Sequence, residues 1–192
     1  ATPAALSAYS AANKSDIPVI FCAVSDPVAA GLTESLEAGY NNCNGTSDIL
    51  DFSAQVDLIQ SIQPDVKKIG VLYTTTEANS MSQLESFKAV CTEKGIEVVD
   101  QGVSGAADIP QAATTLASQV DCINNFTDNN VVNNLSIVLE KANAANIPVY
   151  GSEIEQVKNG CLASISIDYI ALGKKTAEMG VEVLNGTDPK TM

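Results

Sequence analysis

The chain has 192 residues, 45% of them hydrophobic, which is enough for one large domain or two smaller lobes with their own cores. Its 23 acidic and 10 basic residues give a formal net charge of -13, which argues against nucleic acid and anionic membrane surfaces as partners. No apolar run approaches the roughly 20 residues that a membrane-spanning helix needs.

Strand-like and helix-like patterns alternate along the chain, which predicts βαβ units and a parallel sheet. A helix-like segment over 3–13 is followed by a strand over 18–24. Asp26-Pro27 then has the form of an N-cap with proline at the first helical position, so we expect a helix from there to Gly39. The apolar stripe of this helix would be Val28, Leu32 and Leu36.

The later elements continue the alternation. The predicted strands are 69–73, 96–99, 120–126, 147–150 and 161–167. The predicted helices are 53–63, 80–94, 108–118, 130–145, 154–159 and 170–185. The inward side chains of the first two of these helices would be Val56, Ile59, Ile62, Met81, Leu84, Phe87 and Cys91. Because one strand cannot make a lobe, the part before residue 53 is expected to be an incomplete one.

Nearly every predicted strand ends in a small cluster of hydroxyl, amide or carboxylate residues. These clusters are Ser25-Asp26, Thr74 with Asn79-Ser80 beyond it, Thr127-Asp128, Ser152-Glu153 and Asp168-Tyr169. In an open α/β sheet, ligands bind in the crevice beyond the carboxyl ends of the strands. The repeated polar chemistry therefore predicts a cup that binds a small molecule.

The five cysteines are an odd number without a CxxC pair, and the chain has no histidine. Cys22, Cys122 and Cys161 lie in or beside predicted strands, where a thiol behaves as a small hydrophobic group. We expect structural thiols, with a disulfide as the open alternative. The absence of histidine excludes His-bearing zinc sites and Cys–His catalytic pairs, and the sequence predicts no metal site and no cofactor.

Several segments, taken in order, resemble the substrate-binding proteins of ABC transporters with the type I periplasmic-binding-protein fold, in particular the bacterial group with tryptophan- and tyrosine-binding members. The segments are Ala1-Thr2-Pro3-Ala4, Ile17-Pro18-Val19-Ile20-Phe21, Val24-Ser25-Asp26-Pro27, Asn44-Gly45-Thr46-Ser47, Lys68-Ile69-Gly70-Val71-Leu72-Tyr73, Glu77-Ala78-Asn79-Ser80, Thr127-Asp128-Asn129, Ile147-Pro148-Val149 and Ile167-Asp168-Tyr169 with Gly173. Together they cover essentially the whole chain.

This resemblance implies an α/β fold of two Rossmann-like lobes with parallel sheets and the ligand in the cleft between them. Residues 1–47 and 169–192 would belong to the first lobe, and 48–168 to a complete second lobe. The family also implies a βαβα segment ahead of Ala1, so the first lobe is expected to be incomplete here. The implied function is the solute-binding component of an ABC importer. Such a protein lies outside the cytoplasm, in the periplasm or as a lipoprotein on the outer face of the membrane, and its partners are a small amino-acid-like ligand and the membrane permease.

By this resemblance an amino acid is the expected ligand, with an aromatic amino acid as one option. Its carboxylate needs several N–H or O–H donors, and Asn79-Ser80 at a predicted helix start can supply them. Its ammonium group needs a carboxylate, for which Asp128 and Asp168 are the first candidates and Glu153 the third. The further candidate contacts are Thr2, Ser25, Asp26 and Thr127.

The same residue types also serve as helix N-caps without any ligand. For Asp26 capping and ligand contact are equally consistent with the sequence, whereas Asp108 is expected to be a cap. Tyr73, Phe126 and Tyr169 could stack on an aromatic ligand or pack in the core.

Two other functions fit the same fold class. One is the ligand-sensing domain of a receptor or regulator, and the other is a two-lobed α/β enzyme that uses carboxylates for acid–base chemistry. The enzyme is disfavoured because the chain has no histidine, no GxSxG elbow, no P-loop and no GxGxxG fingerprint.

Overall fold

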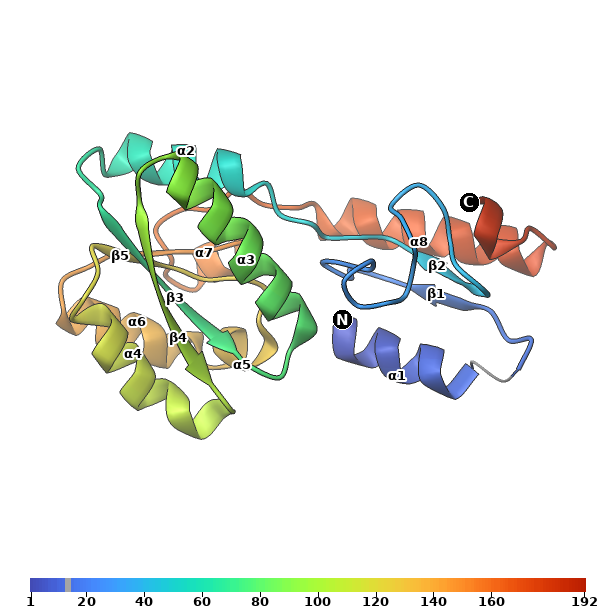
Figure 1. The fold of residues 1–192 in the computed structure, drawn as a ribbon, viewed down its shortest axis with the longest axis horizontal. Coiled ribbons are helices and arrows are strands. Elements are labelled where there is room, and N and C mark those ends of the chain that lie inside the picture. The colour runs from blue at the N-terminus through green and yellow to red at the C-terminus, as the bar shows by residue number, and fades with distance from the viewer. Residues whose placement is uncertain (13–14) are drawn as a thin grey trace. The chain divides into compact units, whose positions relative to one another are not determined.

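The structure, a computed structural model, describes residues 1–12 and 15–192. These residues form two compact units (Figure 1): unit 1 consists of Ala1–Ile49 with Asp168–Met192, and unit 2 of Leu50–Ile167. No helix within the described ranges is both long enough and apolar enough to cross a membrane.

Unit 2 is built on a four-stranded parallel sheet with the strand order β4-β3-β5-β6. The strands are β3 (Lys68–Thr74), β4 (Glu97–Val103), β5 (Cys122–Asn124) and β6 (Val149–Tyr150). Ile69 pairs with Val98 of β4 on one side and with Cys122 of β5 on the other, which fixes the register of these three strands. All strands are parallel, so their carboxyl ends meet at one edge of the sheet.

Helices cover both faces of this sheet (Figure 1), as the buried strands of a parallel sheet require. The helices of unit 2 are α2 (Phe52–Ile62), α3 (Ala78–Glu93), the 3-10 turn η1 (Ala106–Asp108), α4 (Ile109–Ala117), α5 (Asn129–Asn133), α6 (Leu135–Ala144) and α7 (Ile154–Lys158). The helices α2 and α3 share one core cluster with β3, and α4, α5 and α6 share the other.

Three phenylalanine rings form the centre of the core beneath α2 and α3. The ring centroids of Phe52, Phe87 and Phe126 lie 5.4–5.5 Å apart, in edge-to-face or tilted pairs. Phe126, one of the candidate stacking residues, is fully buried in this cluster. Its ring therefore belongs to the core.

On the opposite face, α4 lies unusually close to β3. A Cβ atom at Gly70 would stand 2.9 Å from Leu116 Cγ, closer than real carbon contacts. Glycine at this position therefore permits the close packing of the helix on the strand.

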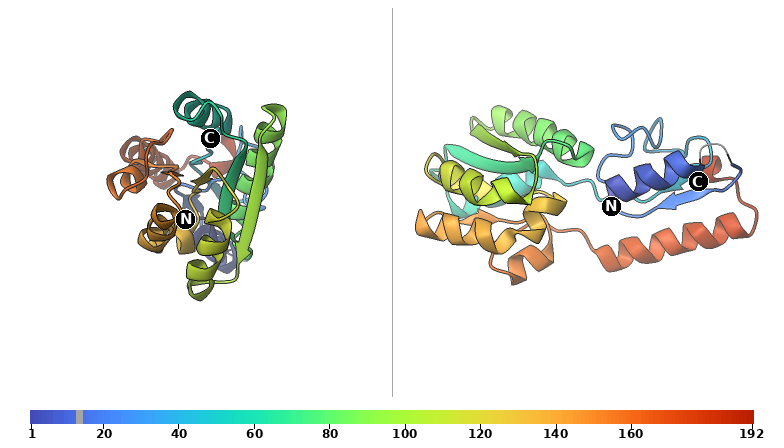
Figure 2. Two further views of the ribbon diagram at one scale, coloured as in Figure 1. Left: turned by 90° about the vertical axis from the view of Figure 1, so that its left-hand side faces the viewer. Right: turned by 90° about the horizontal axis from the view of Figure 1, so that it is seen from below.

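Unit 1 contains a two-stranded parallel ribbon and two packed helices. Its elements are α1 (Thr2–Ala12), β1 (Val19–Phe21), β2 (Cys43–Gly45), α8 (Tyr169–Leu184) and the 3-10 turn η2 (Pro189–Thr191). Both α1 and α8 pack against β1 and lie on different sides of it (Figure 2). The Asn44 side chain donates to the carbonyls of Pro189 and Met192, at 2.8 and 2.9 Å, and thereby holds the C-terminal turn against β2.

The predicted helix from Asp26 to Gly39 does not form. The segment is a series of turns in which the Asp26 carboxylate accepts from Ala29 N at 2.8 Å and Leu32 N donates back to Pro27 O. Gly31 adopts a φ of 71°, the left-handed conformation that ends a helical turn. The expected apolar stripe was wrong, because only Leu32 is buried while Val28 and Leu36 are exposed.

The strands and other helices differ from prediction in smaller ways. The strand expected over 18–24 is shorter and ends before Ala23, which has a φ of 54°, and β2 was not predicted. Residues 161–167 form no strand, although Leu162 N donates to Val149 O and Gly151 N to Ala163 O. The helix expected over 130–145 is divided at Asn134 into α5 and α6. The final residue of the helix expected over 3–13 lies outside the described residues.

Two side chains expected to point inward are exposed. Ile62 at the end of α2 and Met81 in the first turn of α3 are 43% and 40% exposed. Both occupy a terminal turn of their helix. The remaining predicted inward residues of α2 and α3 are buried, namely Val56, Ile59, Leu84, Phe87 and Cys91.

All five cysteines are free thiols, and four of them are buried. Burial raises the pKa of Cys43 to about 11 and the pKa of Cys91, Cys122 and Cys161 to about 12, so these thiols stay protonated and unreactive. Cys22 is exposed, against the prediction that it packs as a small hydrophobic residue.

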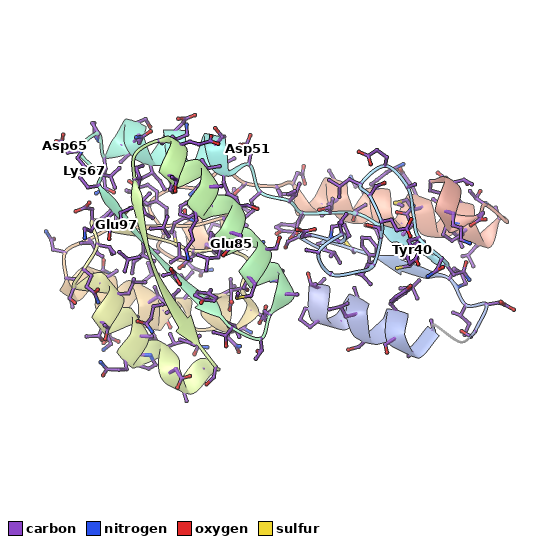
Figure 3. The ribbon with its side chains drawn as sticks, viewed as in Figure 1. Tyr40, Asp51, Asp65, Lys67, Glu85 and Glu97 are labelled. Carbon is purple, nitrogen blue, oxygen red and sulfur yellow. The ribbon has the colours of Figure 1, made fainter. Side chains whose placement is uncertain are left out.

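Asp121 joins the starts of two central strands. Its Oδ2 accepts from Lys67 N and Lys68 N, each at 2.8 Å, at the beginning of β3, near the labelled Asp65 and Lys67 in Figure 3. The hydrogen bonds from these backbone amides, that of Lys67 first, hold the pKa of Asp121 below its usual value.

The ring cluster predicts a large stability loss on truncation. Replacing Phe87 with alanine should lower the free energy of unfolding by about 3–5 kcal/mol, because it opens a cavity between the other two rings. Urea denaturation followed by circular dichroism would measure the change. Met81→Ala on the same helix is the matched control and should have little effect, since its side chain is exposed. Equal losses in the two variants would contradict the packing described.

The Asp121 bonds predict a pH-dependent contribution to stability. Asp121→Ala should lower the free energy of unfolding by roughly 1 kcal/mol at pH 7, a modest figure because the carboxylate is exposed. The folded pKa is depressed, so this contribution is present above the unfolded value of about 3.9 and is lost as the pH falls through the folded pKa.

Melting curves of wild type and variant between pH 7 and pH 2 would check this, and the difference between them should shrink at the acidic end. Asp65→Ala, a neighbouring exposed carboxylate, should show little difference at any pH. A difference for Asp121→Ala that is constant with pH would argue against the role assigned to the ionised carboxylate.

Candidate functional site

The carboxyl ends of β3 and β5 bring four of the predicted site residues into one hydrogen-bonded cluster. Asn79 and Ser80 lie at the start of α3, which follows β3, while Thr127 and Asp128 lie between β5 and α5. The parallel topology places β3 beside β5, so the two segments are neighbours in space although about 50 residues apart in sequence.

Asp128 is the centre of this cluster and is fully buried. Its carboxylate accepts from Thr74 N at 2.6 Å, Thr74 Oγ1 at 2.8 Å, Ser80 Oγ at 2.6 Å and Val131 N at 3.0 Å. It therefore caps α5 and fastens the end of β3 and the start of α3. These four donors satisfy the carboxylate within unit 2.

Two further side-chain bridges connect the same segments. Gln83 Nε2 donates to Thr127 Oγ1 at 2.7 Å, and Thr127 N donates to Gln83 Oε1 at 3.4 Å. Asn129 Nδ2 donates to Glu77 Oε2 at 2.7 Å, and Asn129 N to the same oxygen at 3.3 Å.

Sequence reasoning did not select Glu77, Gln83 or Asn129 as site residues. Glu77 could have been found from its position, since it directly precedes a helix as Asp128 does. Gln83 lies one turn beyond Asn79 on the same helix, which is a weaker signal.

The start of α3 differs from the other helix starts in the cluster because no side chain caps it. Glu77 occupies the N-cap position without a side-chain bond to the helix amides. Its carbonyl accepts from Ser80 N and Met81 N, so the two preceding amides, of Ala78 and Asn79, are the ones that a helix start leaves without a carbonyl partner. The Asn79 side chain is 4% exposed, its Nδ2 faces Glu77 Oε2 and Ser80 Oγ at 3.4 and 3.5 Å, and its Oδ1 has no partner.

Other buried amides near the carboxyl end of β5 also carry unpartnered atoms. Asn125 is fully buried and neither its Oδ1 nor its Nδ2 has a hydrogen-bond partner, and Gln156 Oε1 is likewise unpartnered. Buried polar groups are rarely left unsatisfied, so three such atoms near the end of one strand make this edge of the sheet distinctive.

The remaining predicted carboxylates cap a helix or a turn. Glu153 accepts from Glu155 N and Gln156 N at the start of α7, both at 2.8 Å. Asp168 accepts from Ile170 N and Ala171 N at the start of α8, at 3.0 and 2.9 Å. Asp26 accepts from Ala29 N, so it caps a turn rather than a helix. Asp108, the expected cap of α4, instead accepts from the Ser104 hydroxyl and amide.

In unit 1 the predicted residues Thr2 and Ser25 are both buried. Thr2 Oγ1, in the first turn of α1, has no hydrogen-bond partner. Sequence reasoning missed Asp48, which is 4% exposed: its Oδ2 accepts from the Tyr169 hydroxyl at 2.9 Å, while its Oδ1 has no partner.

Two hollows, one in each unit, lie away from the residues bonded to Asp128. A hollow of about 480 Å³ in unit 1 lies at the amino ends of β1 and β2, where Asp16, Asn42 and Lys190 line it. Ligands of α/β sheets bind at the carboxyl ends, so this hollow is not the expected site. A cavity of about 10 Å³ in unit 2, lined by Gln55, Asn124 and Ser152 among others, has room for about one water molecule.

The chemistry of the cluster is that of hydrogen-bond recognition. It offers hydroxyls, amides and carboxylates, whereas the thiols of the chain are buried or lie elsewhere. Across the described residues, no group of three or more His, Cys, Asp or Glu side chains is placed to hold a metal ion.

Comparison with known proteins identifies a family for this chain. The family model described as ABC transporter substrate binding protein matches residues 1–192. A tyrosine-binding protein of Clostridioides difficile is 42% identical over 185 residues, which is 96% of this chain and 53% of the relative.

Two solved structures extend the comparison. The ABC domain of Streptococcus pneumoniae in complex with L-Trp is 37% identical and superposes with a TM-score of 0.95, covering 100% of this chain and 64% of that one. A solute-binding protein from Bacillus halodurans with bound myo-inositol is 17% identical with a TM-score of 0.63, covering 97% and 67%, and this likeness concerns the fold alone.

The chain therefore has the α/β fold of type I periplasmic binding proteins, with parallel sheets, and spans only part of the length of its relatives. Both the family match and the identity to the C. difficile relative extend over nearly every residue. The chain belongs to the family of ABC transporter substrate-binding proteins.

Proposed function

We propose that this protein binds an aromatic amino acid, tryptophan or tyrosine, and delivers it to an ABC importer. The observation that carries the proposal is the identity to two relatives, one called a tyrosine-binding protein and the other solved with L-Trp. The family consists of solute-binding proteins rather than enzymes. We further propose that the protein has no catalytic activity, works outside the cytoplasm and has a membrane permease as its partner.

The start of α3 is our candidate for the carboxylate of the ligand. A helix N-terminus combines unpaired amides with the positive end of the helix dipole, and α3 is 16 residues long. No side chain occupies these amides, whereas α5 and α7 are capped by Asp128 and Glu153. The Thr127 hydroxyl lies in the same cluster and is a further candidate contact. In unit 1, Thr2 and Ser25 stay candidates, supported for Thr2 by its buried, unpartnered hydroxyl.

We assign Asp128 a supporting role instead of contact with the ammonium group. Its carboxylate already accepts four hydrogen bonds, and all of them come from the segments that form the cluster. A ligand donor would have to displace one of these bonds. Asp128 is therefore better suited to fix the positions of Thr74, Ser80 and the start of α3.

Ligand binding predicts stabilisation by aromatic amino acids. In thermal-shift measurements on the gene product at its full natural length, L-Trp or L-Tyr at 100 times its dissociation constant should add about 2.7 kcal/mol to the free energy of unfolding. Tryptamine and tyramine, which lack the carboxylate, should stabilise far less because the α3 start then has no anion to bind.

Leucine and glycine serve as controls for the aromatic preference. The proposal fails if none of the twenty amino acids raises the melting temperature, or if mass spectrometry shows that the best ligand is converted to a product.

The supporting role of Asp128 predicts a stability defect. Asp128→Asn should lower the free energy of unfolding of the ligand-free protein by roughly 3 kcal/mol, because at least one buried donor loses its acceptor. Urea denaturation without ligand would measure this loss. Asp168→Asn is the matched control and should cost less than about 1 kcal/mol, since asparagine also caps helices well. A ligand-free stability equal to wild type for Asp128→Asn would refute the supporting role.

A further inference from the structure

The carboxylates at the strand ends differ in how many of their oxygens are already bonded. Asp128 accepts four hydrogen bonds, and both oxygens of Glu153 accept from backbone amides. Glu77 is the exception, because every bond to it, from Asn79 and Asn129, ends on Oε2. Its Oε1 accepts no hydrogen bond from the part of the chain that the structure describes.

Glu77 is also a buried charge without a cation. The residue is 8% exposed, and none of the ion pairs among the described residues includes it. Buried carboxylates are usually paired with a positive group or fully hydrogen-bonded. Only one of the three bonds to Oε2 is short, 2.7 Å from Asn129 Nδ2, so the hydrogen bonding of Glu77 is incomplete.

The neighbouring Asn79 offers a second unused acceptor. Its amide orientation follows from Glu77, because the opposite orientation would place Oδ1 against the carboxylate oxygen that Nδ2 now faces at 3.4 Å. Oδ1 is then buried and without a partner. A charged acceptor and a neutral one thus lie two residues apart at the start of α3, and both lack a donor.

We propose that Glu77 Oε1 and Asn79 Oδ1 form the subsite for the ammonium group of the ligand. An ammonium group has several donors and a positive charge, so it can satisfy both acceptors and neutralise the buried carboxylate. Its position beside the α3 amides matches an α-amino acid, whose carboxylate and ammonium groups are attached to one carbon. This inference rests on the proposed function, and it makes Glu77 the residue that selects amino acids over acids without an amino group.

Asp48 is the competing carboxylate, because its Oδ1 is also without a partner. Its other oxygen already accepts from the Tyr169 hydroxyl, and Asp48 lies in the segment between β2 and α2 and not at the start of a helix. Asp48 belongs to unit 1, whereas Glu77 and Asn79 belong to unit 2. Its conservative variant is therefore a matched control for removal of a buried charge.

The test compares two ligands on three proteins by isothermal titration calorimetry. The ligands are L-Trp and indolepropionate, which is tryptophan without its ammonium group, and L-Tyr with hydroxyphenylpropionate would replace them if tyrosine is the better ligand. The proteins are wild type, Glu77→Gln and Asp48→Asn at full natural length. Glu77→Gln should weaken the amino acid roughly ten- to a hundredfold, the range of a hydrogen bond between charged groups, and leave the affinity for the propionate nearly unchanged.

The alternatives give different results. If Glu77→Gln lowers the affinity for both ligands equally, Glu77 only supports Asn129. If only Asp48→Asn lowers the affinity for the amino acid selectively, the ammonium subsite lies at Asp48. Either result would overturn the assignment to Glu77. Wild type that binds both ligands equally would refute an ammonium subsite while leaving the proposed function intact. Wild type that binds no amino acid would refute the proposed function and the subsite together. If Glu77→Gln does not fold, Asn79→Ala should show the same selectivity in weaker form.

Discussion

The arrangement at the carboxyl edge of unit 2 depends on the hydrogen bonds of one carboxylate. Asp128 follows β5, yet it accepts from Thr74 at the end of β3, Ser80 at the start of α3 and Val131 in α5. Because the carboxylate is fully buried, these bonds form in a medium of low dielectric constant, where each is stronger than in water and its loss is costly. The bonds fix the start of α3, and the start of α3 carries the candidate binding groups.

The polar groups around Asp128 fall into two classes. Those that hold the segments together have complete hydrogen bonding, as Asp128 and the pair of Gln83 and Thr127 show. Glu77 and Asn79 keep unused acceptors, and both amide atoms of the buried Asn125 are unpartnered. Unsatisfied buried groups lower stability, so a fold retains them where function requires them. In the subsite proposed above, the ammonium group of the ligand would complete the hydrogen bonding of Glu77 and Asn79.

The sequence predicted most of the helices and strands of unit 2, because the apolar pattern of each core segment agrees with the structure that the segment forms. The apolar periodicity of α2 and α3 identified Val56, Ile59, Leu84 and Phe87 as core residues, and the alternation with strands indicated the parallel sheet. The prediction from sequence failed between Asp26 and Gly39. An N-cap residue and an apolar stripe predicted a helix there, but Gly31 adopts the left-handed conformation and no helix forms. The prediction also missed β2, whose three residues are held by pairing with β1 and not by their own propensity.

The sequence by itself determined the kind of residues that gather at the strand ends, because parallel strands bring their carboxyl ends to one edge of a sheet. It did not determine their roles, since an aspartate before a helix looks the same whether it caps that helix, supports a neighbouring segment or binds a ligand. Only the tertiary structure decided that Asp128 is saturated with donors and that Glu77 keeps one oxygen uncommitted. The physical reason is that hydrogen-bond satisfaction depends on partners about 50 residues away in the chain, which no local pattern encodes.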